Sequence, residues 1–217
     1  MIRLCVTGIA LLLCVSAFSQ ADLTSWTALA LNYKANDKLT LVVKPIHRRN
    51  NDLSGHDNTS IDIIANYKLG KGWAVSILDR HFFVPDRPDM VFTFFDIKNS
   101  FKSGKFQISN GFRYHLGRFE TRDFVRYFPG VTLITNSAFT PFASIDFFMD
   151  KDFSDLAGAR YTAGVKYKLN ASSGLNFIFW RQQGYSDRPL ATQNNLYLTY
   201  SYNINANKKS TTAPNSN

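Results

Sequence analysis

The chain has 217 residues, a formal net charge of +9 and a mean hydropathy of -0.18. This length fits one domain, and beyond the N-terminus no window is apolar enough for a membrane-spanning helix. A transmembrane barrel escapes that test, because lumen-facing and lipid-facing residues alternate and cancel in the average. The aromatic content of 15% exceeds what a basic soluble binding domain needs. The pattern along the chain must therefore decide the class.

Residues 1–21 have the three parts of a secretory signal peptide. Arg3 gives a basic start, an apolar stretch covers 9–15, and small residues follow. The apolar part is shorter than the roughly 20 residues of a spanning helix. Cleavage fits after Ala21 or after Ser19. We therefore expect a cleaved leader and export to the outer membrane.

Both cysteines, Cys5 and Cys14, lie in this leader. The mature chain then has no thiol, which excludes disulfides and Cys-ligated metals. Lipidation of Cys14 is the alternative, but Leu13 stands where a lipoprotein signal needs a small side chain. We interpret Cys14 as a core residue of the leader.

Eleven segments alternate apolar and polar residues with the period of a β-strand. In 60–69, for example, Asp62 and Lys68 share the polar face, whereas Ile63 and Tyr67 belong to the apolar face. Most segments approach the roughly 9–11 residues of a tilted membrane strand. The predicted strands are 25–34, 38–48, 59–69, 73–84, 90–101, 105–116, 121–134, 139–150, 159–169, 173–184 and 194–204.

The connections between these strands alternate in length. The short ones lie at 35–37, 70–72, 103–104 and 170–172. The long polar ones lie at 49–58, 84–89, 151–158 and 185–193. Short turns on one rim and long loops on the other are typical of outer-membrane barrels, with the short turns in the periplasm.

We therefore predict an all-β fold, an antiparallel up-and-down transmembrane β-barrel of ten to twelve strands over residues 22–204. Single-chain bacterial barrels have even strand numbers, so we favour ten or twelve strands over the eleven counted. Residues 205–217 are polar and are predicted to form a disordered tail.

The two rims also differ in composition. Lysines gather near the short turns, where they would meet anionic headgroups: Lys34, Lys38, Lys68, Lys71, Lys102, Lys105 and Lys168. Aromatic residues at strand ends are predicted to form interfacial girdles: Tyr33, Tyr67, Phe83, Phe101, Tyr114, Tyr167 and Tyr202.

Several strand segments resemble one family of outer-membrane barrels. They are Ser-Trp-Thr-Ala-Leu at 25–29, Ile-His-Arg at 46–48, and 63–69 followed by Gly-Lys-Gly-Trp at 70–73, together with 112–114, 144–148, 160–167 and 196–202. The family is domain of unknown function 2490, which is found mainly in Bacteroidetes. Its members carry more inward Arg and Glu than this chain does. The resemblance implies a barrel in the outer membrane and no particular reaction.

The alternation places charged residues on the inward face, with bases in excess. They are Asp62, Lys68, Arg80, Asp96, Lys98, Arg113, His115, Arg122, Arg126, Asp146, Arg160, Lys166 and Lys168. One interpretation is a porin-like path that favours anions. The other, which we place slightly ahead, is that these residues pair across the barrel and fill a narrow lumen.

Two further kinds of site were weighed. Outer-membrane phospholipases resemble the Ser109–Gly111 stretch but carry a His two residues before the Ser, where this chain has Gln107. His115 and Asp96 are the remaining candidates for a base and its orienter. The four histidines show no metal-ligand spacing, although His56 with its neighbouring aspartates offers a weak cation site in a loop.

The resulting prediction is a non-catalytic outer-membrane barrel, acting as a narrow channel or as a structural or binding element. The alternatives are an outer-membrane lipid hydrolase or acyltransferase, and a soluble periplasmic barrel with its apolar face inward. We expect no cofactor and no metal. The expected partners are outer-membrane lipids, the barrel-assembly machinery, periplasmic chaperones and a small anionic solute. Export excludes nucleic acid as a natural partner.

Overall fold

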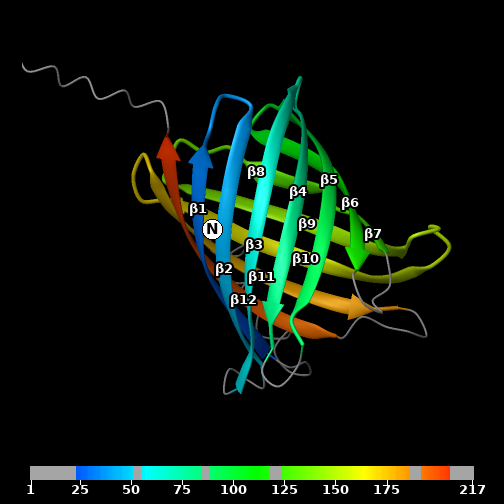
Figure 1. Ribbon diagram of the computed structural model, residues 1–217. Coiled ribbons are helices and arrows are strands. Elements are labelled where there is room, and N and C mark those ends of the chain that lie inside the picture. Colours follow the sequence, from blue (N-terminus) through cyan, green and yellow to red (C-terminus); the bar gives the residue numbers. More distant parts are fainter. Residues whose placement is uncertain (1–22, 51–54, 85–87, 118–123, 186–191, 206–217) are drawn as a thin grey trace, which may run out of the picture.

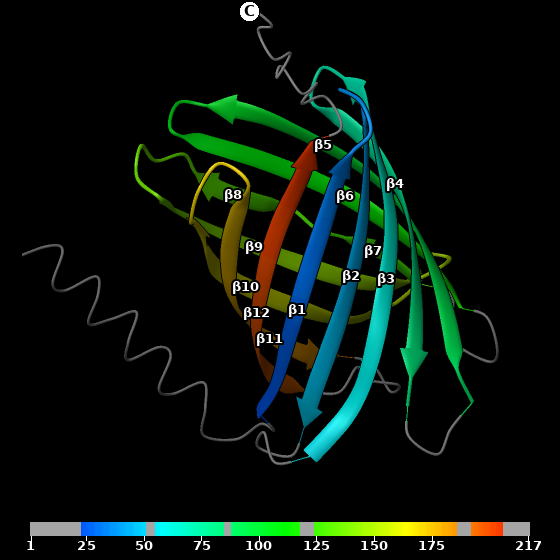
Figure 2. The same ribbon diagram turned by 60° about the vertical axis from the view of Figure 1, so that its left-hand side comes forward.

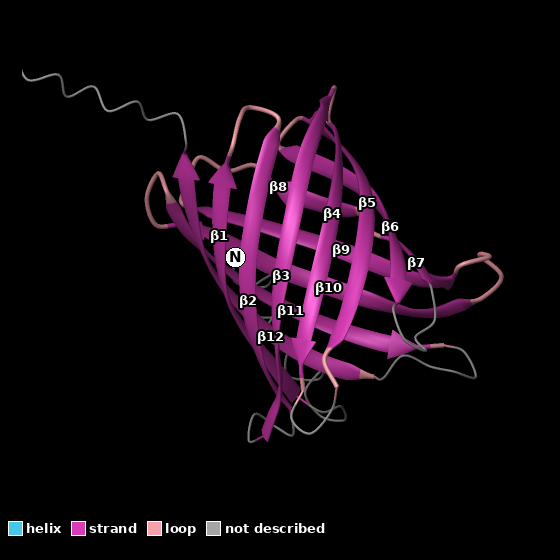
Figure 3. Ribbon diagram, viewed as in Figure 1, coloured by secondary structure: helices cyan, strands magenta, loops and turns pink. Residues whose placement is uncertain are grey.

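The computed structural model describes residues 23–50, 55–84, 88–117, 124–185 and 192–205. These residues form strands and short connections (Figure 3). None of them belongs to a helix long and apolar enough to cross a membrane. The predicted leader, most of the predicted tail, and Arg122 lie outside the described residues.

The strand bounds follow the predicted segments closely. They are β1 (Leu23–Lys34), β2 (Leu39–Asn50), β3 (Gly55–Gly70), β4 (Trp73–Phe83), β5 (Met90–Ser103), β6 (Phe106–Gly117), β7 (Phe124–Tyr127), β8 (Gly130–Leu133), β9 (Phe139–Asp150), β10 (Leu156–Lys168), β11 (Ser173–Gly184) and β12 (Gln193–Asn205).

The short elements β7 and β8 are one barrel strand. Both pair with β6 on one side and with β9 on the other, in an unbroken register. The pairing lapses only at Phe128 and Pro129, because proline has no amide hydrogen to donate. Each strand therefore pairs with two neighbours, and eleven strands close the barrel, as counted in the sequence.

The preference for an even strand number is wrong for this chain. β1 pairs with β12 in parallel, from Leu23 opposite Asn194 to Lys34 opposite Asn205. The arrowheads of these two strands lie side by side and point to the same rim (Figures 1 and 2). A parallel closing pair permits an odd number of strands, whereas purely antiparallel closure requires an even number.

Tight turns at one rim use specific local chemistry. Gly70, Lys71 and Gly72 all have positive φ, which glycine tolerates best. The side-chain oxygens of Asn36 and Asn170 each accept two backbone N–H groups of their own turn. We call this rim the short-turn rim and the opposite one the long-loop rim.

Two connections at the long-loop rim are shorter than predicted. β2 continues to Asn50 and β3 begins at Gly55, where a loop over 49–58 was expected. β10 begins at Leu156, inside the expected loop 151–158. A register irregularity between Arg48 and Arg49, and another between Leu156 and Gly158, let these strands extend despite polar residues that interrupt the alternation.

The two faces of the wall differ as the alternation predicts. In β3, Ile63 is 53% exposed on the outer face, whereas Asp62 is 0% exposed on the inner face. Six of the seven predicted girdle residues are exposed on the outer surface: Tyr33, Tyr67, Phe83, Phe101, Tyr114 and Tyr202. The seventh, Tyr167, is half-buried and stacks on Phe139. The outside of the barrel is therefore apolar over most of its strands.

Candidate functional site

Arginines and aromatic rings alternate around the inside of the barrel. The Arg48 guanidinium lies 4.3 Å from the centroid of Trp26 and 4.6 Å from that of Phe82. Arg80 lies 5.8 Å from Phe82 and 5.6 Å from Phe94. These contacts cover β1, β2, β4 and β5, and each is within the range of a cation–π interaction.

The series continues around the opposite wall. Arg113 lies 5.0 Å from Phe94, and its cross-strand neighbour is Arg126. The ring centroid of Phe148 lies 5.6 Å from the guanidinium of Arg126 and 5.2 Å from that of Arg160. We call this set the arginine–aromatic belt: Trp26, Arg48, Arg80, Phe82, Phe94, Arg113, Arg126, Phe148, Arg160 and Trp180.

Trp180 closes the belt. Its ring centroid is 4.3 Å from Arg160 and 5.4 Å from the ring of Trp26, which it meets edge to face. The belt residues lie towards the ends of the strands that meet the long-loop rim. The belt is thus a nearly continuous ring of cations and aromatic faces in one half of the lumen.

Three buried aspartates neutralise part of this charge. Asp62 accepts hydrogen bonds of 2.6 and 2.8 Å from Arg80 and lies 3.3 Å from Lys44. Asp96 accepts 2.5 and 2.8 Å bonds from Arg113 and lies 3.2 Å from Lys98. Both arginines are held by two-pronged carboxylate contacts, the strongest geometry for such a pair.

The third aspartate is shared more loosely. Asp146 lies 3.8 Å from Arg126 and directly opposite Arg160 in the β9–β10 register. Arg160 donates to Gln182 at 2.6 Å. The Nε atoms of Arg48, Arg126 and Arg160 are buried and have no hydrogen-bond acceptor among the described residues. Within those residues, five arginines and two lysines of the lumen meet three aspartates. The arginines without a two-pronged carboxylate contact are Arg48 on β2, Arg126 on β7 and Arg160 on β10.

A cavity of about 460 Å³ adjoins the belt in the long-loop half of the lumen. Its lining includes Arg80, Arg113, Arg126, Arg160 and Asp146 with eight Phe or Trp rings, Phe82 and Phe92 among them. This volume lies within the range of small-molecule sites. A molecule that enters the cavity therefore meets both positive charge and aromatic rings.

The short-turn half of the lumen has different side chains. Inward positions there include Ala28, Ala30, Gly164 and Gly174, and a cavity of about 280 Å³ is lined by polar residues such as Thr140 and Ser201. Lys166 lies in this half, 5.3 Å from the ring of Phe142. Several inward positions of the short-turn half thus carry small side chains, and the ring of Phe142 lies over Gly164.

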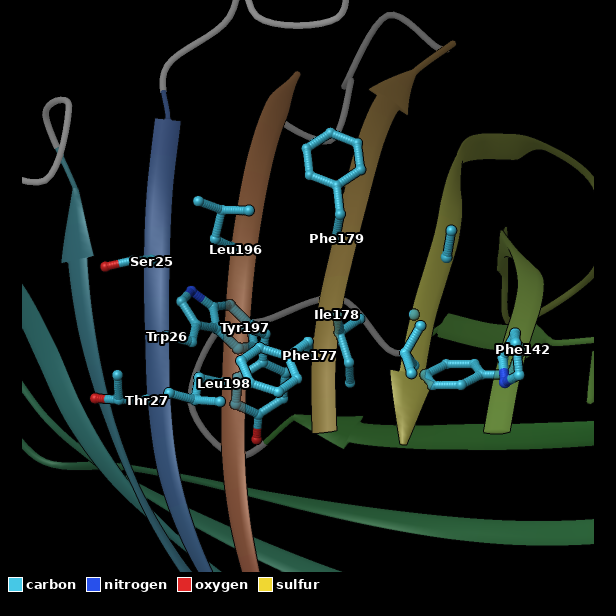
Figure 4. Close-up of a pocket in the computed structure, with 14 residues that line it drawn as sticks. Ser25, Trp26, Thr27, Phe142, Phe177, Ile178, Phe179, Leu196, Tyr197 and Leu198 are labelled. Atoms are coloured by element: carbon cyan, nitrogen blue, oxygen red, sulfur yellow. The ribbon is translucent and has the colours of Figure 1, made fainter. Parts of the chain in front are cut away.

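A larger hollow of about 650 Å³ crosses β9–β12 and β1 (Figure 4). Its lining includes two rows of outward side chains: Ser25, Leu196 and Phe179 in one, and Thr27, Leu198 and Phe177 in the other. The described residues that line it include no charged side chain. This hollow in the apolar wall contrasts with the charged cavity of the lumen.

Of the predicted inward residues, Arg122 lies outside the described residues. Arg80, Arg113, His115, Arg126, Asp146 and Arg160 line the cavity, and Asp62 and Asp96 bind two of these arginines. His115 is buried among Phe92, Phe94 and Phe124, with its ring stacked 4.5 Å from that of Phe94. Lys68, Lys166 and Lys168 lie apart, in the short-turn half.

The hydrolase alternative finds no geometric support. Ser109 and His115 are six residues apart on β6, which corresponds to about 20 Å along a strand. The Ser109 hydroxyl donates to the Gly130 carbonyl at 3.3 Å, and Asp96 is occupied by Arg113. Within the described residues no group of three or more acidic, His or Cys side chains is arranged to hold a metal. The loop site predicted around His56 includes Asp52, which lies outside those residues.

Sequence reasoning missed the inward aromatic residues and Arg48. Near the long-loop rim the chemical alternation is reversed: in β4, Phe82 faces inward, whereas Asp79 faces outward and accepts a 2.6 Å hydrogen bond from Thr93. A strict count of odd and even positions from the start of each strand would have found the aromatic half of the belt.

The chain matches a known family over residues 23–195, described as "Protein of unknown function (DUF2490)". The chain belongs to this family. The DUF2490 match begins with β1 and extends into β12, so it covers every strand of the belt. A search among curated proteins found no match.

Proposed function

We propose that this DUF2490 protein is an outer-membrane barrel whose basic lumen admits small anions and forms a narrow passage for them. The observation that carries the proposal is the excess of guanidinium groups at the belt, where five arginines and two lysines face three aspartates among the described residues. Cations in a narrow, poorly solvated lumen raise the local concentration of anions and oppose the entry of cations.

The outer surface supports the membrane location. Large apolar side chains such as Leu29, Ile77, Phe95 and Phe177 are exposed on the outward face. A contiguous apolar surface of this kind needs lipid or a protein partner to cover it. The soluble alternative requires an apolar inside and a charged outside, which is the reverse of this arrangement. Insertion would require the barrel-assembly machinery of the envelope.

Planar bilayers test the passage. The refolded full-length protein is expected to give small conductance steps, with a reversal potential in a KCl gradient that indicates preference for chloride. Arg126→Gln is expected to reduce that preference, because it removes a charge that Asp146 only partly neutralises. Lys168→Gln removes the same charge from the exposed short-turn rim and is expected to change the reversal potential less. A lack of conductance steps, or cation preference in the unmodified protein, would refute the passage.

Membrane insertion is tested separately by tryptophan fluorescence. Trp73 is 45% exposed on the outer surface, whereas Trp26 and Trp180 line the lumen cavity. In vesicles with brominated acyl chains, Trp73 is expected to be quenched much more than the two lumen tryptophans. Equal quenching of single-Trp variants would contradict the proposed orientation of the wall.

A further inference from the structure

The lumen cavity combines two kinds of recognition surface. Four guanidinium groups provide positive charge, and the faces of Phe and Trp rings provide most of the remaining wall. Arg80 and Arg113 each already bind a carboxylate through two-pronged bonds, to Asp62 and Asp96. A bound anion would therefore interact with the arginines whose hydrogen bonding is incomplete.

Of the four arginines that line the cavity, these are Arg126 and Arg160. Asp146 lies 3.8 Å from Arg126 and opposite Arg160, and the Nε–H of each arginine is buried without an acceptor among the described residues. A buried charged donor without a partner is unfavourable, so an acceptor placed between these groups stabilises both. Phe148 lies beside both guanidinium groups, at 5.6 and 5.2 Å.

The uncharged wall indicates what the rest of the ligand is like. Trp180 lies 4.3 Å from Arg160 and meets Trp26 edge to face at 5.4 Å. Hydroxyl groups in the lining are few, and they come from Ser144, Thr162 and Tyr197. A polyhydroxylated anion would leave many of its own groups unpaired there, whereas an aromatic ring continues the alternation of rings and guanidinium groups.

We infer that the lumen binds an aromatic carboxylate, with its carboxylate between Arg126 and Arg160 and its ring against Phe148 and Trp180. This inference rests on the proposed function, since it names the class of anion that the basic lumen selects. The cavity of about 460 Å³ is large enough for a ligand of one or two rings.

Phenylacetate, cyclohexylacetate and phenylacetamide separate the contributions of ring and charge. The full-length barrel carrying Trp73→Phe leaves Trp26 and Trp180 as its only tryptophans, and both line the cavity. Phenylacetate is expected to change their fluorescence saturably. The affinities for the other two compounds are expected to be about tenfold weaker or worse, since the ring of cyclohexylacetate is not aromatic and phenylacetamide has no charge.

Variants locate the site. Arg126→Gln and Arg160→Gln are each expected to weaken phenylacetate binding about tenfold, a loss typical of one charged hydrogen bond. Lys168→Gln, the same change of charge outside the cavity, is expected to leave binding unchanged. Arg160→Lys keeps the charge but loses the planar donor pair, so it is expected to weaken binding even if Arg160→Gln fails to fold.

Equal affinity for cyclohexylacetate and phenylacetate, or equal loss in Lys168→Gln, would overturn the inference. These outcomes are distinct from failure of the proposed function. Chloride preference without phenylacetate binding would leave the passage standing and remove the ligand. Saturable phenylacetate binding without any conductance would remove the passage and keep the binding site.

Discussion

The two halves of the lumen are built on one wall and differ in the side chains that face inward. In the long-loop half, Phe82, Phe94 and Trp180 reach inward with the belt arginines. In the short-turn half, the inward positions include Ala28 and Gly164, and the ring of Phe142 lies over Gly164. Strand number and tilt set the radius of a barrel, so in this protein the inward side chains decide how that radius is filled.

The halves also differ in what stabilises them. The long-loop half depends on buried ion pairs that are paired residue by residue, such as Asp62 with Arg80. The short-turn half has exposed lysines and turns closed by Asn36 and Asn170. Substitutions should therefore be much more harmful on one side of the belt than on the other.

The largest effect is expected for Asp62→Asn. The change leaves Arg80 and Lys44 facing a neutral group that is fully buried. Removing one partner of a buried ion pair typically destabilises by about 3–5 kcal/mol. Urea unfolding in detergent micelles measures it, with Lys168→Gln as a control expected to leave the midpoint unchanged. Similar unfolding midpoints for the two variants would show that the two halves of the lumen are equally sensitive to substitution.

A smaller effect is expected where the two halves meet. A Cβ added at Gly111 would come within 2.2 Å of the Phe128 ring, which occupies the space above that glycine. Gly111→Ala should destabilise the barrel by about 1–3 kcal/mol through overpacking. Adding Phe128→Leu should restore part of that loss. If the double variant is no more stable than Gly111→Ala alone, the ring is not what requires a glycine there.

The smallest effect is expected in the conductance of the proposed passage. Phe92→Ala removes a ring from the cavity wall in the long-loop half and should raise the single-channel conductance about twofold, because it frees cross-section beside the belt. Thr140→Ala, in the short-turn half, should leave conductance unchanged. Equal increases would place the constriction elsewhere.

Much of the fold could be predicted because the period of two is strong over most of the strands. The predicted segment 121–134 corresponds to β7 and β8 taken together, and six of the predicted inward residues line the lumen cavity. The barrel closure could not be predicted, because alternation along a strand says nothing about which neighbour it pairs with or in which direction. The β1–β12 pair depends on the closed sheet as a whole.

The sequence predicted most of the charged residues of the candidate site but not its aromatic residues. Asp96 and Arg113 were placed inward because polar residues mark the wet face of a strand. Phe94 and Trp180 were not, because an aromatic residue fits both a lipid-facing and a lumen-facing position. Only the geometry shows that these rings separate the arginines from one another.

The parallel closing pair has a mechanical consequence. Because β1 starts at the long-loop rim and β12 ends at the short-turn rim, force applied to Leu23 and to Asn205 pulls the two strands past each other. Such a shear load is shared by all the hydrogen bonds between them at once. An antiparallel closing pair with both ends at one rim would instead open one bond at a time, like a zip. The parallel β1–β12 pair, which makes the number of strands odd, therefore resists force by loading all of its hydrogen bonds together.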